Sequence, residues 1–383
     1  MKKIFGSLMV FAFILGCSSD NGAGISDDVD PGPVAGPDSG PVSFERGPML
    51  VNWADNIIIP SYVAFSSEVS GLNTSLETFK SDATATNLVD LRTAWESAYL
   101  AWQRVDMFEI GPAETVGLRL NLNIYPVDSG KIENFIASGN YDLALSSNRD
   151  AKGFPALDYL INGLGESDEA IAAKYNSGNN EALIAYIEAV LADMTTLTEQ
   201  VLSEWQDGYR DTFVANDGSS STASVDRFVN DYIFYYEKFL RAGKMGIPLG
   251  VFSGTAQSGK TEAYYKADLT NQLFLEGLDA TQDFFNGKHY GKDTSGESLA
   301  SYLDALNSVK EGEDLKAIIN GQFDTARDAV SGLNSFREEI ENNNPATDML
   351  LAYDEVQRAV PLLKVDMVSA MSINIDFVDA DGD

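Results

Sequence analysis

Apolar residues recur along most of the chain at alternating steps of three and four positions, which is the period of an amphipathic α-helix. The pattern begins near residue 49 and continues almost to the end. It predicts helices over residues 62–79, 88–105, 183–201, 225–239, 315–340 and 350–367. Pro361 lies inside the last of these and is expected to kink it, because proline cannot donate the helical hydrogen bond. Alternating strand patterns are short and rare, so we expect an all-α fold.

A glycine-rich stretch, residues 243–261, interrupts the helical pattern. We therefore predict two helical bundles in one chain, an N-terminal bundle over residues 45–250 and a C-terminal bundle over residues 251–383. An ancient duplication would explain two bundles of this kind, although the two halves show no direct sequence repeat.

The first 16 residues are typical of a signal peptide, since Lys2 and Lys3 precede an apolar run from Ile4 to Leu15. This run is shorter than the ~20 residues that a membrane-spanning helix needs. It ends in Leu15-Gly16-Cys17, which resembles the lipobox of bacterial lipoproteins. The alternative is a plain secretory signal with an incidental cysteine.

Cys17 is the only cysteine and the expected lipidation site. Residues 17–44 are rich in Gly, Pro, Ser and Asp, and are predicted to be a flexible tether. We therefore expect an outer membrane lipoprotein on the periplasmic or cell-surface face, held to the membrane only through its lipid anchor.

The charge of the chain is strongly negative. Among 383 residues, 26 are Lys or Arg and 58 are Asp or Glu, which gives a formal net charge of −32. Such a surface repels phosphate backbones, so no nucleic-acid partner is expected, and it favours cations or cationic ligands. One His and one Cys exclude a disulfide framework and the two-His zinc proteases.

Residues 254–261 match the P-loop pattern GxxxxGK[ST]. A working P-loop lies between a buried strand and a helix, and the pattern around this segment is helical instead. We therefore expect no nucleotide to bind, and interpret the segment as a glycine-rich connection.

Trp102 and Glu109 share a helix face if the helix continues to residue 109. The Glu109 carboxylate would then face the core, where a base or a cation must compensate it. Alternatively, Gly111 and Pro112 end the helix and Glu109 meets solvent. Asp106 lies one turn before Glu109, and Arg104 is a candidate ion-pair partner for both acids.

Residues 153–158 are expected to open a helix, with Pro155 suited to its first position. Asp158 would then lie in the first turn, where a carboxylate interacts favourably with the helix dipole. The functional alternative is that Asp158 is a ligand at the mouth of a site.

Several segments, in this order along the chain, resemble the imelysin-like family of exported bacterial proteins, which is classed among the M75 peptidases. The matching segments are residues 94–104, 108–112, 125–132, 153–160, 244–255 and 363–367. The resemblance implies an all-α fold of two bundles with a site between them, and a link to iron-regulated uptake.

The family's proposed metal motif is Gly-x-His-x-x-Glu. Gly153 is retained here, whereas Pro155 stands at the His position and Asp158 replaces the Glu. Without that His a zinc peptidase site lacks its nitrogen ligand, because catalytic zinc normally takes at least one His. Carboxylates of Glu109, Asp128 and Asp158 would suit a hard cation, iron or calcium. The expected ligand-binding residues are Trp102, Arg104, Glu109, Asp128, Pro155 and Asp158.

The leading functional prediction is a non-enzymatic lipoprotein that binds a ligand or metal for iron uptake, together with an uptake partner in the cell envelope. One alternative is a metallopeptidase of the M75 type. The other is a structural or interaction protein of the cell envelope.

Overall fold

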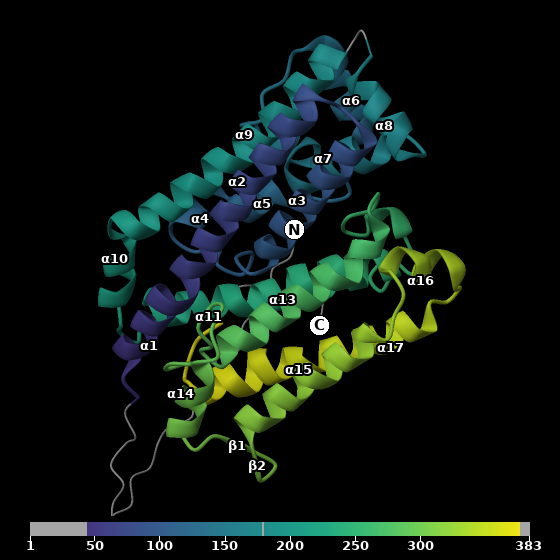
Figure 1. Ribbon diagram of the computed structural model, residues 1–383. Coiled ribbons are helices and arrows are strands. Elements are labelled where there is room, and N and C mark those ends of the chain that lie inside the picture. Colours follow the sequence, from purple (N-terminus) through teal and green to yellow (C-terminus); the bar gives the residue numbers. More distant parts are fainter. Residues whose placement is uncertain (1–43, 178–179, 376–383) are drawn as a thin grey trace, which may run out of the picture. The chain divides into compact units, whose positions relative to one another are not determined.

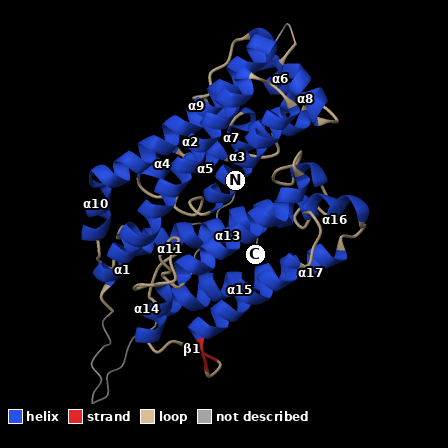
Figure 2. Cartoon of the chain, in the orientation of Figure 1, coloured by secondary structure: helices blue, strands red, loops and turns tan. Residues whose placement is uncertain are grey.

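A computed structural model describes residues 44–177 and 180–375 (Figure 1). The predicted signal peptide, the lipidation site Cys17 and the tether up to residue 43 lie outside the described residues. Helices make up nearly all of the regular structure in the described part (Figure 2), which confirms the all-α fold class.

The first half of the described chain consists of α-helices that several π-helical or 3-10 segments, labelled η, extend or connect. These elements are α1 (Arg46–Asn52), η1 (Trp53–Ile58), α2 (Ile59–Ser81), α3 (Ala85–Gln103), α4 (Pro112–Val116), α5 (Leu118–Leu122), α6 (Ser129–Ser138), η2 (Ser146–Ala151), α7 (Gly153–Asp158), η3 (Tyr159–Gly163), α8 (Asp168–Tyr175), α9 (Asn180–Glu204), η4 (Trp205–Tyr209) and α10 (Arg210–Ala215).

The second half is also helical and contains one small antiparallel hairpin, in which Val309 pairs with Asp314. Its elements are α11 (Ser224–Phe234), η5 (Tyr235–Gly246), α12 (Ile247–Leu249), η6 (Ser258–Lys260), η7 (Ala267–Leu269), α13 (Thr270–Phe285), α14 (Leu299–Ala305), β1 (Val309–Lys310), β2 (Glu313–Asp314), α15 (Leu315–Ser331), α16 (Phe336–Asn342), α17 (Thr347–Pro361), η8 (Leu362–Met367) and α18 (Val368–Ala370).

The helices pack as the apolar periodicity predicts. In α2 the whole predicted stripe is buried, from Tyr62 to Phe79, and it faces α3 and α9. The buried stripe of α3 runs from Leu88 to Trp102, and the Thr84 side chain caps the start of that helix by accepting a hydrogen bond from Asn87 N. Figure 1 shows α2, α3 and α9 side by side.

The later helices pack around the continuous helix formed by α11 and η5. That helix contacts α13 and α17, and α15 lies against both α13 and α17. A further contact joins α13 to α3, so described residues on either side of the glycine-rich stretch belong to one packed unit. The division into bundles at residue 250 stays a prediction.

Two predicted helices differ in detail from the structure. The stripe over residues 315–340 forms two helices, α15 and α16, separated after Ser331. At Pro361, where a kink is expected, α-helical hydrogen bonding gives way to the π-helix η8. The P-loop-like segment 254–261 follows the helical residues of α12 and contains η6, rather than joining a strand to a helix.

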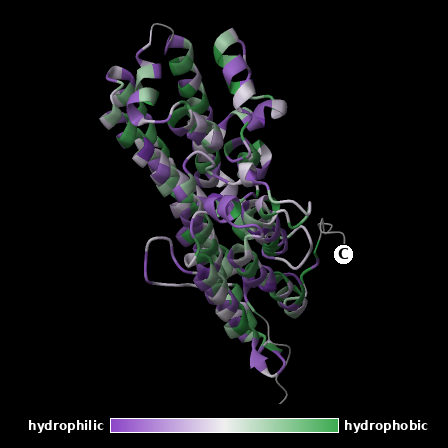
Figure 3. Ribbon diagram, turned by 90° about the vertical axis from the view of Figure 1, so that its right-hand side faces the viewer, coloured by the Kyte–Doolittle hydropathy of each residue, from purple (hydrophilic) through white to green (hydrophobic). Residues whose placement is uncertain are grey.

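None of the described helices is both long enough and apolar enough to cross a membrane. Figure 3 shows hydrophilic and hydrophobic residues interleaved along the helices, as expected when one face of each helix is buried and the other is wet.

Gly153, at the start of α7, has a φ of +73°, in the left-handed region. A methyl group on this residue would lie 2.1 Å from the Leu122 carbonyl oxygen. The close approach of α7 to the end of α5 therefore requires glycine.

We expect Gly153→Ala to lower the free energy of unfolding by about 3 kcal/mol or more, since backbone strain and a steric clash add. Gly139→Ala is the control, because Gly139 has a φ of +63° with nothing within 4 Å of an added methyl group. That variant should lose only about 1 kcal/mol, the cost of the left-handed backbone. Equal losses in urea denaturation would contradict the close-approach argument.

Candidate functional site

The last residue of α3 and the turn that follows it, residues 103–109, carry polar side chains that point in three directions. We call this segment the α3 turn. Gln103 donates toward Glu262, Arg104 reaches α13, and Asp106 pairs with Arg119. Each of these contacts joins the α3 turn to a different part of the chain.

Arg104 is forked between two carboxylates on one face of α13. Its Nε pairs with Glu276, and its Nη1 lies 2.7 Å from Asp283 Oδ2. The two acids are seven residues apart, which places them on the same side of the helix two turns apart. Arg104 therefore does not pair with Asp106 or Glu109 as expected, because the guanidinium points toward α13 and Arg119 takes those partners.

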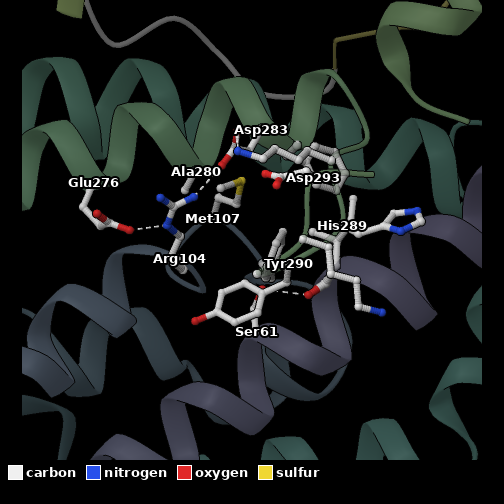
Figure 4. Close-up of a pocket in the computed structure, with 15 residues that line it drawn as sticks. Ser61, Arg104, Met107, Glu276, Ala280, Asp283, His289, Tyr290 and Asp293 are labelled. Carbon is white, nitrogen blue, oxygen red and sulfur yellow. Dashed lines mark hydrogen bonds and ion pairs between the residues drawn. The ribbon is translucent and has the colours of Figure 1, made fainter. Parts of the chain in front are cut away.

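Beside this fork lies an open pocket with a volume of about 330 Å³. Figure 4 shows Arg104, Glu276 and Asp283 along one side of it. Its apolar lining comes from the residues Ile57, Met107, Phe108, Ala280 and Phe284. We call this cavity the Arg104 pocket. Its size and mixture of apolar and charged groups are typical of small-molecule sites.

Another wall of the Arg104 pocket is formed by the loop 288–293. Hydrogen bonds from or to its main chain, and to the residues that flank it, hold this loop in place. The Asn52 side chain donates to the carbonyl oxygens of Gly287 and Glu297, at 3.1 Å each. Tyr290 N donates to the Asn56 carbonyl oxygen at 2.9 Å. The wall is thus held to the first helices of the chain.

His289 belongs to this wall, but its ring points away from the Arg104 pocket in Figure 4. Its Nδ1 lies 2.9 Å from the Thr294 hydroxyl. The single histidine of the chain therefore has a role in the loop, and its ring does not face the cavity.

A second group of charges lies behind the α3 turn, around Arg119. Its guanidinium lies 3.0 Å from Asp106 Oδ1 and 3.2 Å from Asp231 Oδ2, and its side chain is only 4% exposed. Its main-chain N donates to Glu109 Oε2 at 2.9 Å. The guanidinium is thus shared by two carboxylates, and the main chain of the same residue binds the third, so two buried acids depend on a single cation.

A third group lies around the buried ion pair of Lys244 and Glu262, both 2% exposed. Asn123 Nδ2 donates to Glu262 Oε1 at 2.7 Å, and Tyr99 donates to Asn123 Oδ1 at 2.6 Å. Gln103 completes the group from the α3 turn. These bonds fasten the segment after α12 to α3 and to the end of α5.

Two expected ligand-binding residues belong to the apolar core. The Trp102 ring packs against Phe65 and Phe154, with ring centroids 5.6 and 6.3 Å apart. Pro155 is buried in α7, and its ring carries no atom that could replace the imidazole nitrogen of the family motif.

Asp158 is buried and holds a distant backbone segment. It is the last residue of α7, rather than a first-turn residue as expected, so it does not interact with the start of that helix. Its Oδ2 accepts from Tyr265 N at 2.8 Å and its Oδ1 accepts from Asn162 Nδ2 at 3.0 Å. Asp128 instead caps α6 by accepting from Lys131 N at 2.9 Å.

The structure does not bring Glu109, Asp128 and Asp158 together. Each accepts a hydrogen bond from a different backbone segment. Across residues 44–177 and 180–375, no group of three or more His, Cys, Asp or Glu side chains is arranged to hold a metal ion. Glu109 lies beyond the end of α3, is half-buried, and accepts a hydrogen bond from the main chain at the start of α5. It is therefore neither on the core-facing side of a helix nor freely exposed to solvent.

Burial changes the acidity of these carboxyl groups. It raises the pKa of Asp106 to about 6, although Arg119 opposes the shift. Burial likewise raises the pKa of Glu109 to about 7, against Arg119, and that of Asp158 to about 7, against its hydrogen bond from Tyr265 N. The folded protein therefore binds protons that the unfolded chain releases near neutral pH.

The sequence did not identify most of the residues around Arg104. Glu276 and Asp283 look like ordinary exposed positions of an amphipathic helix, and their partner is more than 170 residues away. Of the residues that line the Arg104 pocket, only Arg104 and Phe108 lie in segments that resemble the family. Long-range pairing of this kind leaves no periodic signal in the sequence.

Comparison with known proteins identifies the family. The family model of imelysin, peptidase M75, matches residues 58–360. The chain therefore belongs to the imelysin family, and the resemblance seen in the sequence is confirmed.

Relatives of known description agree with this assignment. Iron-regulated protein A of Synechococcus elongatus is 28% identical over 113 residues, 29% of this chain and 30% of that protein, so the match spans less than a third of that relative. A crystal structure described as an iron-regulated protein A precursor, from Parabacteroides distasonis, has a TM-score of 0.70 at 16% identity and covers 86% of this chain and 97% of its own. The crystal structure of an imelysin-like protein from Psychrobacter arcticum has a TM-score of 0.67 at 15% identity. The match covers 87% of this chain and 97% of that protein's chain. Both structures show that the fold is shared.

We expect Arg119→Met to lower the free energy of unfolding by about 3–5 kcal/mol, because it leaves buried carboxylates without their cation. Arg227→Met is the matched control, since Arg227 and its partner Glu114 are each about half exposed. Its loss should stay below about 1 kcal/mol in the same denaturation experiment. Similar losses for both variants would show that the Arg119 group is not a structural anchor.

We also expect stability to fall as the pH rises from 5 to 8. A carboxyl group whose pKa is higher in the folded state than in the unfolded state binds protons on folding. It stabilises the folded state fully at pH values below its pKa in the unfolded state, and this contribution is lost as the pH rises through its pKa in the folded state. For Asp158 the pKa rises from its ordinary value of 3.8 to about 7 in the folded protein, because the carboxyl group is buried. At about 1.4 kcal/mol per pKa unit, this group contributes up to a few kcal/mol.

The variant Asp158→Asn, which does not titrate, should show a smaller loss of unfolding free energy between pH 5 and 8 than the parent protein. The exposed Asp354→Asn serves as the control and should follow the parent. A parent protein whose stability rises over this interval would refute the argument.

Proposed function

We propose that this chain is a non-enzymatic binding component of the cell envelope, connected to iron uptake, and that it takes a small ligand in the Arg104 pocket. The observation that carries the proposal is the pocket itself. It is a cavity of about 330 Å³ with an apolar floor and charged walls, and its walls are fixed by the Arg104 fork and by Asn52.

The link to iron rests on the relatives. The Synechococcus protein and the Parabacteroides structure both carry the description iron-regulated protein A. The lipobox-like segment ending at Cys17 supports anchoring to the outer membrane, on its periplasmic or surface face, where an uptake partner would be met.

The non-enzymatic role is supported by the altered motif. Pro155 occupies the position of the metal-binding His, and the Asp158 carboxylate is used in backbone contacts. The alternative, a metallopeptidase, rests on the family's name. Zinc-dependent cleavage of peptides by the purified protein would favour it over the binding role.

The proposal predicts that loss of the Arg104 fork impairs iron uptake. A strain lacking this chain should take up less radiolabelled iron under iron limitation. The parent gene and the Arg227→Met variant should restore uptake, whereas Arg104→Met should leave it near the level of the deletion strain.

Variant protein levels in the envelope, followed by immunoblot, separate a binding defect from misfolding. Unchanged iron uptake in the deletion strain would overturn the iron-linked role.

A further inference from the structure

The β-hairpin between α14 and α15 exposes apolar surface at one end of the described helices. Val309, in β1, is 68% exposed, and Val365, in η8, is 59% exposed. Figure 1 shows β1 and β2 beyond the ends of α14 and α15. The Lys310 amine pairs with Asp366, so the hairpin and η8 lie against each other at this surface.

Val309 lines two adjoining hollows. The larger has a volume of about 470 Å³, and its apolar lining comes from Leu306, Val309, Leu315, Val365 and Ala370. The smaller has a volume of about 200 Å³ and also contains Leu303 in its lining. We call the two hollows together the hairpin groove.

Contacts within the chain fix the hairpin groove. Ser308 N donates to the Leu303 carbonyl oxygen, and Leu315 N donates to the Ser308 carbonyl oxygen, at 3.1 Å each. Asn307 and Glu311, on either side of β1, have φ of +50° and +55°. A residue with a side chain adopts this left-handed backbone only where its surroundings require it. A surface fixed in this way loses little conformational entropy when a partner binds.

The rim of the hairpin groove is acidic. Glu311 and Glu313 are exposed, and their carboxylates make no hydrogen bond or ion pair with any residue that the structure describes. The lysines of residues 303–316 and 362–370 are each paired with an acid already: Lys310 with Asp366, Lys316 with Asp304, and Lys364 with Glu237. The carboxylates of the hairpin are therefore left in excess.

Charge decides which partner this surface fits. Residues 17–43 hold five Asp and residues 376–383 hold four, with no Lys or Arg in either segment. A second copy of the chain carries a net charge of −32. The acidic rim would repel all three, and also the anionic headgroups of a lipid surface. The partner that fits carries apolar side chains together with Lys or Arg.

The hairpin groove lies near the point where the predicted membrane anchor joins the described chain. The ring of Phe44, the first described residue, stacks on Tyr302 of α14 with 4.3 Å between centroids. Tyr302 is one turn before Leu306, which lines the groove. A partner in the same membrane would therefore be near this end of the protein.

We propose that the hairpin groove binds a basic, apolar segment of the uptake partner. Apolar side chains of that segment lie beside Val309 and Val365, and its Lys or Arg residues pair with Glu311 and Glu313. This inference rests on the proposed function for the existence of the partner, and it adds the surface and the chemistry of the contact. It does not depend on the Arg104 pocket.

Two labelled seven-residue peptides test the chemistry by fluorescence anisotropy with the purified protein, one of alternating Lys and Val and one of alternating Glu and Val. The Lys peptide should bind, more weakly as salt is raised, and the Glu peptide should bind at least tenfold more weakly. Glu311→Gln combined with Glu313→Gln should weaken binding of the Lys peptide about fivefold, through two lost ion pairs. Val309→Ser should weaken it by about the same factor, through lost apolar burial.

Matched controls separate the groove from general attraction to an acidic protein. Glu166→Gln combined with Glu169→Gln removes the same charge from exposed positions near the start of α8. Val89→Ser removes a valine that is 45% exposed on α3. Both controls should change the affinity less than twofold. Equal affinities of the groove variants and the controls for the Lys peptide would overturn the inference.

In cells, a photo-crosslinking residue in place of Val309 should join this chain to a basic, apolar segment of an envelope protein. Cross-linking to an acidic segment, to a second copy, to lipid or to nothing would overturn the inference. The proposed function fails separately, through unchanged iron uptake in the deletion strain.

Discussion

The bonds made by the α3 turn fix the geometry on which the proposed site depends. Arg104, Asp106 and Gln103 lie within four residues of one another, and their networks include α13, Asp231 and Glu262. The side chains of Asp106, Arg119 and Glu262 are at most 4% exposed. Buried charges of this kind are tolerated only when they are paired with good geometry. The turn is therefore held from three sides, and Met107 and Phe108 are placed in the pocket floor as a consequence.

The same arrangement separates residues that hold the fold from residues that are available to a ligand. Arg119, Lys244 and Glu262 are buried and fully engaged, and Asp158 fastens the backbone at Tyr265. Lys292 and Asp293, in contrast, are exposed on the wall of an open cavity, and neither side chain forms an ion pair within the described chain. In a protein of this family whose motif histidine is replaced by Pro155, a preformed pocket is a better basis for function than the altered motif.

Local features of the fold could be read from the sequence, whereas the site could not. The stripe from Tyr62 to Phe79 predicted α2 because helix periodicity is a property of neighbouring residues. The π-helical segments and the break after Ser331 depend on tertiary packing and left no such signal. The prediction that Arg104 binds a ligand stays a prediction. Its expected ion-pair partners were wrong, since Glu276 and Asp283 are brought to it only by the packing of α13 on α3.

The central claim is that the Arg104 pocket holds the physiological ligand. A crystal structure of the protein purified from its own cell envelope, without added ligand, tests this most directly. We expect electron density for a small organic molecule in the Arg104 pocket, over the floor formed by Met107 and Phe284. Density for a bound molecule elsewhere, for example between Asp158 and the 264–266 segment, with only water beside Arg104, would contradict it.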